Sequence, residues 1–134
     1  MTDSVFGEVS FEGTWHKKEK ISYYYCGKTY QILACIIAHK ETDPITDEQR
    51  QDYSAFKKNQ HAIEQEVESL LIAFRDDNPS FVSSDLLELL TPAYLDFERR
   101  GGYAVLFDDA SDPDEGIVVV LAPEKDVTYQ SLYL

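Results

Sequence analysis

Apolar and polar residues alternate along the first forty positions in the manner of β-strands. The alternation runs through residues 5–12, stops at Gly13 and resumes at Trp15. A period of two places successive side chains on opposite faces of a sheet, so these segments are expected to be strands. Residues 30–37 carry apolar side chains on both faces instead. This pattern is typical of a central strand, and it requires another element to cover that strand.

The pair Cys26-Gly27 has the composition of a tight turn between strands at 21–25 and 28–38. In that register Cys35 lies opposite Lys18, which puts the two sulfurs about 25 Å apart at roughly 3.3 Å of strand per residue. The two cysteines are therefore predicted to be free thiols. Free thiols are expected of a protein in a reducing cytoplasm.

The next segment has the spacing of one long helix. Residues 46–49 (Thr-Asp-Glu-Gln) have the form of a capping box, and the helix is expected to end near Arg75. That gives about 28 residues and about 42 Å, enough to cross a sheet and cover its central strand. Apolar residues recur in steps of three and four at Tyr53, Phe56, Ile63, Val67, Leu70, Leu71 and Phe74, with Gln60 at the one polar position of this seam.

The seam makes a prediction about stability. Alanine at Phe56 or Val67 should open a buried cavity and lower the free energy of unfolding. Alanine at Glu64 is expected to change it little.

The rest of the chain combines a short helix with several strands. The helix is expected at 84–90, capped by Ser83 or Ser84 and stopped by Pro92. Strand-like segments follow at 93–97, 103–107, 117–121 and 127–133, with a hairpin turn at 99–102 (Arg-Arg-Gly-Gly). The predicted fold is α+β, an antiparallel sheet with one long helix and a short helix packed on one face. The 134 residues are expected to form a single domain, 1–134.

Composition indicates a soluble cytoplasmic protein. Hydrophobic residues make up 43% of the chain, so a packed core rather than disorder is expected. The start of the chain has neither the basic nor the apolar region of a secretory signal. The longest apolar run, Ile32 to Ala38, is far shorter than the roughly 20 residues that a membrane span needs.

Charge is divided unevenly between the two halves of the chain. Residues 1–67 carry a balance of −3 and residues 68–134 a balance of −10, which together make the net charge of −13. Such a surface repels nucleic acid and anionic membranes, and it attracts basic proteins or cations. The acids that stand out are Asp76 and Asp77 after the long helix, and Asp108, Asp109, Asp112, Asp114 and Glu115 in a loop between two strands.

This loop, residues 108–115, has three interpretations. It is a solvated hairpin loop, a patch that binds a protein partner, or a cation site. An EF-hand loop carries Gly at its sixth position, whereas here the glycine of Asp112-Pro113-Asp114-Glu115-Gly116 is fifth and a proline stands in the first turn. The calcium pattern is therefore broken, and no bound metal or other cofactor is expected.

Catalytic signatures are absent from the sequence. His16, His39 and His61 have no metal-ligand spacing, and neither cysteine belongs to a C-x-x-C pair. Cys35 lies in an apolar run, which should raise the pKa of its thiol and leave it inert. Asp96 and Glu98 point to one strand face in the manner of a glycosidase pair, but an acidic chain supplies such pairs by chance. The protein is not expected to be an enzyme.

The sequence also resembles a known kind of family. Phe6-Gly7-Glu8-Val9 leads to Trp15, an Ile-Thr-Asp-Glu-Gln segment (45–49) opens the long helix, and Gly102 precedes an apolar strand and the acidic turn. This order resembles a widespread bacterial family of uncharacterised small cytoplasmic proteins. Members often occur near polymorphic toxin and immunity genes. The resemblance implies no catalytic residue.

Two functions from different classes follow. The first is an immunity protein whose carboxylates bind and neutralise a cognate toxin with a basic surface, such as a nuclease. Such an immunity protein is expected to be a monomer or weak homodimer. The second is a housekeeping domain that binds a cation or small ligand through residues 108–115. An enzyme with an unrecognised site is the third alternative.

Overall fold

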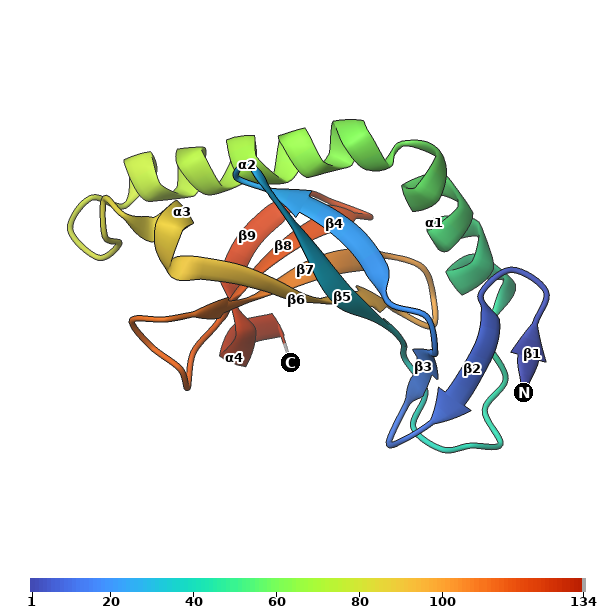
Figure 1. The fold of residues 1–134 in the computed structure, drawn as a ribbon. Helices are drawn as coiled ribbons and strands as arrows, with labels where there is room; N and C mark the ends of the chain where they lie inside the picture. The colour runs from blue at the N-terminus through green and yellow to red at the C-terminus, as the bar shows by residue number, and fades with distance from the viewer. Residues whose placement is uncertain (134) are drawn as a thin grey trace.

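The computed structural model describes residues 1–133 and shows a wide, curved β-sheet with helices against it (Figure 1). The strands of this range are β1 (Thr2–Asp3), β2 (Gly7–Phe11), β3 (Trp15–Lys17), β4 (Ile21–Tyr25), β5 (Lys28–Ile36), β6 (Leu90–Phe97), β7 (Tyr103–Asp109), β8 (Ile117–Ala122) and β9 (Asp126–Tyr129). The helices are α1 (Asp47–Lys58), α2 (Gln60–Asp77), α3 (Leu86–Leu89) and α4 (Gln130–Tyr133). The α+β class is confirmed, and the sheet is wider than the sequence predicted.

The sheet is mixed rather than antiparallel. Its order is β1-β2-β3-β5-β6-β7-β8-β9, with β4 beside β5. The pair β5–β6 is parallel, with Cys35 opposite Asp96, and the other pairs are antiparallel. The expectation of a purely antiparallel sheet is therefore wrong. The reason is the connection 37–89, which contains α1, α2 and α3 and returns the chain to the same end of the sheet, as a crossover between parallel strands requires.

The predicted long helix is two helices that meet at Asn59. The capping box at its start is confirmed, because Thr46 Oγ1 accepts from Gln49 N and Gln49 Oε1 accepts from Thr46 N. The Asn59 side chain donates to the carbonyl of Ala55 at 2.9 Å, and its backbone leaves helical geometry. Asparagine competes with the helix for backbone partners in this way. Figure 1 shows α1 turning away from the axis of α2 at this point.

The sequence also misplaced three boundaries in the second half. The short helix predicted at 84–90 is only α3, and its cap residue Asp85 makes no capping side-chain bond. Pro92 does not stop a helix but lies inside β6, next to a shift in the pairing with β7. The last predicted strand, 127–133, is β9 followed by one turn of helix, α4. Short elements such as these are decided by tertiary packing more than by local preference.

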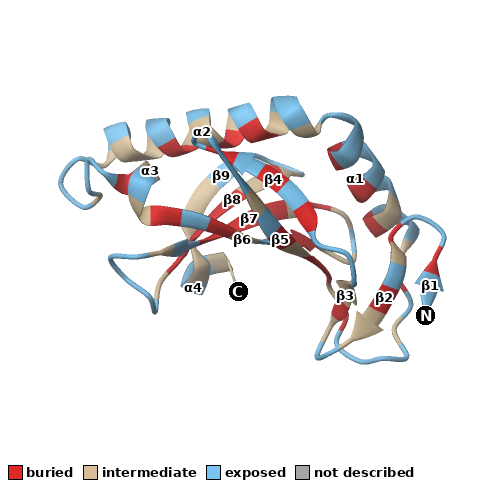
Figure 2. Ribbon diagram, viewed as in Figure 1, coloured by how far each residue is buried: buried red, intermediate tan, exposed pale blue. Residues whose placement is uncertain are grey.

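Two apolar clusters of described residues occupy opposite faces of the sheet. Figure 2 marks in red the buried residues along its strands. Val105 and Phe107 of β7 belong to the main cluster, which also contains Phe56 of α1 and Leu71 of α2. Alternate residues of β7 point to the other face, where Ala104, Leu106 and Val118 are buried and Tyr133 of α4 packs against them. The helices therefore do not all lie on one face. None of the helices within residues 1–133 has the length and apolarity of a membrane span.

The hairpin at Cys26-Gly27 is confirmed, with Tyr25 opposite Lys28. Both turn residues have positive φ, 47° and 83°, which suits a two-residue turn between twisted strands. Cys26 and Cys35 are free thiols as predicted. Cys35 lies opposite His16 of β3 rather than Lys18, because residues 18–20 connect β3 to β4 and are not paired with β5.

Two side chains of α2 cover the outer edge of β4. The Tyr24 backbone N–H donates to Glu64 Oε2 at 2.8 Å, and Gln60 Nε2 donates to the Ser22 carbonyl at 2.7 Å. Glu64 is buried, although the sequence predicted that replacing it with alanine would change the free energy of unfolding little. The helix-to-strand contact joins residues 40 apart, which is why local periodicity does not reveal it. Covering an edge also prevents its pairing with another chain.

Alanine at Glu64 is now expected to destabilise the protein by about 1–3 kcal/mol, because the Tyr24 N–H loses its charged partner at a half-buried position. Urea unfolding of Glu64→Ala beside Gln65→Ala, whose side chain is exposed on the same helix, measures the difference. Equal midpoints for the two variants would show that the edge contact contributes nothing.

Candidate functional site

The acidic loop lies between β7 and β8, as predicted from sequence. Asp108 and Asp109 are the last residues of β7, and residues 110–116 form the loop proper. Asp108, Asp112 and Asp114 are exposed. This placement leaves the three carboxylates available to another molecule.

Two other acids of the loop serve its own conformation. One carboxylate oxygen of Asp109 accepts from the backbone N–H and the hydroxyl of Ser111, at 2.9 and 2.6 Å. Glu115 accepts from the backbone N–H of Ser131 at 3.0 Å and from its hydroxyl at 2.7 Å. These bonds from Ser131 hold the pKa of Glu115 below its ordinary value. Asp109 and Glu115 therefore shape the loop and tie it to α4.

The acidic loop borders a pocket of about 150 Å³, called the acidic pocket below. The end of α2 and the segment before α3 supply apolar walls, including Phe81, whose side chain is 87% exposed. Asp109, Asp112 and Glu115 supply the polar side. An apolar depression beside carboxylates can receive a side chain that is apolar along its stem and cationic at its tip. The lining residues are Phe74, Phe81, Val82, Ser83, Leu86, Leu89, Asp109, Ser111, Asp112, Glu115, Ile117 and Tyr129.

Asp76 and Asp77, the other predicted partner-binding acids, are the last two residues of α2 and are exposed. Asp76 accepts from Arg75 Nε at 3.1 Å and lines a second pocket of about 230 Å³. Val82 lines both this pocket and the first, so the two pockets adjoin at Val82. Asp76 thus lines a pocket next to the acidic one, whereas Asp77 lines neither of the two.

The described carboxylates do not converge on a cation. Within residues 1–133, no three His, Cys, Asp or Glu side chains come together in an arrangement that could hold a metal ion. Asp109 and Glu115 instead accept hydrogen bonds from serines.

A row of potentially reactive side chains crosses the opposite face of the sheet. His16 of β3 is paired with Cys35 of β5, and Cys35 with Asp96 of β6. Burial raises the pKa of the Cys35 thiol to about 12, with the nearby Asp96 adding to the shift, so the thiol stays protonated and weakly nucleophilic, as its apolar surroundings predicted. Glu98 is not free to act with Asp96, because it accepts from the Tyr133 hydroxyl at 2.9 Å.

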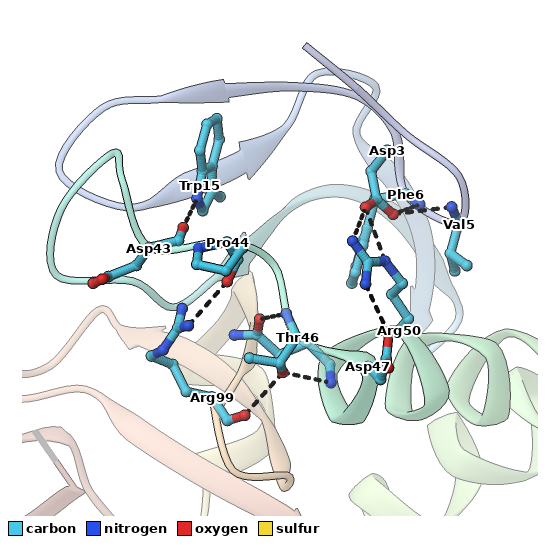
Figure 3. A network of polar contacts seen from close by, with 11 residues as sticks. Asp3, Val5, Phe6, Trp15, Asp43, Pro44, Thr46, Asp47, Arg50 and Arg99 are labelled. Carbon is cyan, nitrogen blue, oxygen red and sulfur yellow. Dashed lines mark hydrogen bonds and ion pairs between the residues drawn. The ribbon is translucent and has the colours of Figure 1, made fainter.

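Sequence reasoning missed an ion pair that joins the N-terminal strand to α1 (Figure 3). Asp3 accepts from Arg50 Nε at 2.9 Å and Nη2 at 2.7 Å, and its second oxygen accepts from the N–H groups of Val5 and Phe6. Arg50 Nη1 donates to Asp47. Burial opposes ionisation of Asp3, but the bonds from Arg50 and the backbone outweigh it and lower its pKa. The partners lie 47 residues apart, so no local signal marks them.

Figure 3 also shows how α1 is held to the neighbouring loops. Thr46 Oγ1 donates to the Arg99 carbonyl, Arg99 Nη2 donates to the Pro44 carbonyl, and Trp15 Nε1 donates to the Asp43 carbonyl. Asp3, Trp15 and Arg50 line a cavity of about 680 Å³. These polar groups bond one another, so the network joins α1 to the N-terminal strands and to the neighbouring loops.

Comparison with known proteins gives one finding. A family described as a domain of unknown function, DUF6985, matches residues 5–133. Comparisons with curated proteins and with solved structures find no match. Because the match extends over nearly the whole chain, the protein belongs to the DUF6985 family.

Proposed function

We propose that the protein is an immunity protein that binds a cognate toxin with a basic surface and neutralises it. The contact surface consists of the acidic pocket, whose carboxylates lie within residues 109–117, and of the exposed carboxylates beside it. The observation that supports this function best is the combination, in one pocket, of apolar walls, an exposed phenylalanine and the carboxylate of Asp112, which forms no ion pair within 4.0 Å among the described residues.

Each part of this surface has a physical role in binding a protein. Phe81 is 87% exposed beside the pocket, and large aromatic side chains dominate the binding energy of many interfaces. Asp112 and Asp114 carry charge that no described cation neutralises within 4.0 Å. Carboxylates placed this way can occupy a cationic groove in place of substrate phosphates and accelerate association. Binding of this kind requires no catalytic group.

The proposal extends to the cellular setting. Free thiols at Cys26 and Cys35 suit a reducing cytoplasm. The resemblance of the sequence pattern to small proteins encoded near toxin genes supports a toxin as the partner. We propose a monomer or weak homodimer that meets the toxin without nucleic acid or membrane.

Charge reversal at the loop is expected to abolish protection from the toxin. The experiment co-expresses the protein with the toxin domain encoded beside it and compares growth. Asp112→Lys/Asp114→Lys should fail to rescue growth, because association slows and a basic groove is repelled. Asp109 and Glu115 are left intact because their bonds to Ser111 and Ser131 shape the loop. Wild-type affinity should fall as salt rises.

The matched control is Glu12→Lys/Glu41→Lys, which makes the same change in net charge at exposed positions outside the acidic pocket. This control should rescue growth as the wild type does. Equal rescue by both folded double variants would exclude the loop as the contact surface. A wild type that neither rescues growth nor forms a complex on gel filtration would exclude that toxin as the partner.

A further inference from the structure

A lysine pocket lies away from the acidic loop, lined by residues of α1 and of the segment around the connection from β3 to β4; Figure 1 shows where these elements lie in the fold. Its volume is about 280 Å³, and Lys17, Lys20 and Lys57 line it. Gln60 lines this pocket and Phe74 lines the acidic one, so about 21 Å of helix α2 separates the two. The protein therefore has a lysine-lined pocket and a separate carboxylate-lined pocket, although its net charge is −13.

The charge of this pocket is neutralised only in part by its own lining. In the described part of the chain, the ion pairs within 4.0 Å involve His16, Arg50, Arg75 and Lys125, and none involves a lysine of the pocket. Glu19 is the acid in the lining, so the lining carries three positive charges and one negative charge. Like charges gathered in this way repel one another, and a bound anion relieves the repulsion.

Stabilisation of helix α1 explains the positions of only some of these lysines. Lys57 and Lys58 stand in the last turn of α1, where the helix dipole favours cations. Lys17 and Lys20 come from a different segment, about 40 residues earlier, and gain nothing from that dipole. The position of Lys57 is further set by Tyr53, whose ring centroid lies 5.9 Å from the ammonium nitrogen. Two segments thus bring cations to one apolar-floored pocket.

We infer that the lysine pocket binds the phosphate groups of a small phosphorylated molecule. Ammonium groups on flexible stems bind anions as point charges, so the affinity rises with the charge of the anion, which favours phosphates over a single carboxylate. The net charge of −13 repels an extended polyanion such as nucleic acid more strongly than a small ligand. This inference is independent of the proposed toxin binding.

The test is titration of the full chain with inorganic pyrophosphate, without metal and at constant ionic strength, followed by calorimetry and by amide chemical shifts. Saturable binding should move the amides of 17–22 and 53–60 and raise the melting temperature through linkage. Lys17→Gln/Lys57→Gln should lower the affinity at least about tenfold, since one such contact near 4 Å in water contributes a factor of roughly five. Lys28→Gln/Lys40→Gln, exposed lysines outside the pocket, should leave it unchanged.

A second variant tests the pocket by a gain of affinity. Glu19→Gln removes the negative charge of the lining and should tighten pyrophosphate binding about fivefold, whereas Glu41→Gln, with the same change in net charge, should not. A misfolded protein cannot produce such a gain. Absence of saturable binding to the wild type would overturn the inference. Equal affinities for Glu19→Gln and Glu41→Gln would also overturn it, because the whole-protein charge would then explain the effect.

Discussion

Alanine at Phe56 is expected to lower the free energy of unfolding by about 3–5 kcal/mol. Phe56 is 1% exposed, faces the sheet from α1, and packs edge-on against Tyr103 of β7 with ring centroids 6.2 Å apart. Deleting the ring removes its transfer free energy and leaves a cavity that the surrounding strands fill only in part. Urea unfolding followed by circular dichroism measures the change.

The matched control is the same substitution at an exposed phenylalanine. Phe81→Ala removes an identical ring from a side chain that is 87% exposed, so its effect on stability is expected to stay within about 0.5 kcal/mol. Phe81→Ala should nevertheless weaken toxin binding if the acidic pocket is the contact surface. Coincident unfolding midpoints for the two variants would contradict the packing of α1 on the sheet.

Asparagine at Asp96 is expected to stabilise the protein at pH 7 by about 1–3 kcal/mol. Burial and, secondarily, the charge of Glu98 raise the pKa of Asp96 from 3.8 to about 6, against the opposing effect of a bond from Cys35. Because folding raises the pKa of this carboxyl, the folded protein favours the protonated form of Asp96 over the ionised form. The contribution of Asp96 to the free energy of unfolding is therefore fully present below about pH 4 and is lost as the pH rises to about 6. A shift of one unit corresponds to about 1.4 kcal/mol.

The measurement is the free energy of unfolding at several pH values between 4 and 7 for wild type, Asp96→Asn and the exposed control Asp114→Asn. The difference between wild type and Asp96→Asn should grow across this range, while the control follows the wild type. Asp3 does not affect this comparison. Its pKa is lowered by folding, so its contribution to the free energy of unfolding is lost only at pH below about 4. Parallel pH profiles for wild type and Asp96→Asn would show that Asp96 ionises freely in the folded protein.

The position of the acidic pocket could be predicted only in part from sequence. The loop between β7 and β8 was visible because its charges and its proline are contiguous. The pocket itself depends on Phe74 and Val82 meeting that loop across the sheet, and the sequence has no signal for this contact. For the same reason sequence spacing did not distinguish Asp76, which lines the adjoining pocket, from Asp77, which lines neither pocket.

By itself, the sequence determined the features whose causes lie within a few residues. The Cys26-Gly27 turn, the capping box at Thr46 and the Arg-Arg-Gly-Gly turn at 99–102 follow from local backbone preferences and hydrogen bonds. Only the tertiary structure decided the parallel pairing of β5 with β6, the burial of Glu64 against β4 and the Asp3–Arg50 ion pair. Each of these joins residues at least 40 positions apart, and such contacts are selected by the packing of the whole chain.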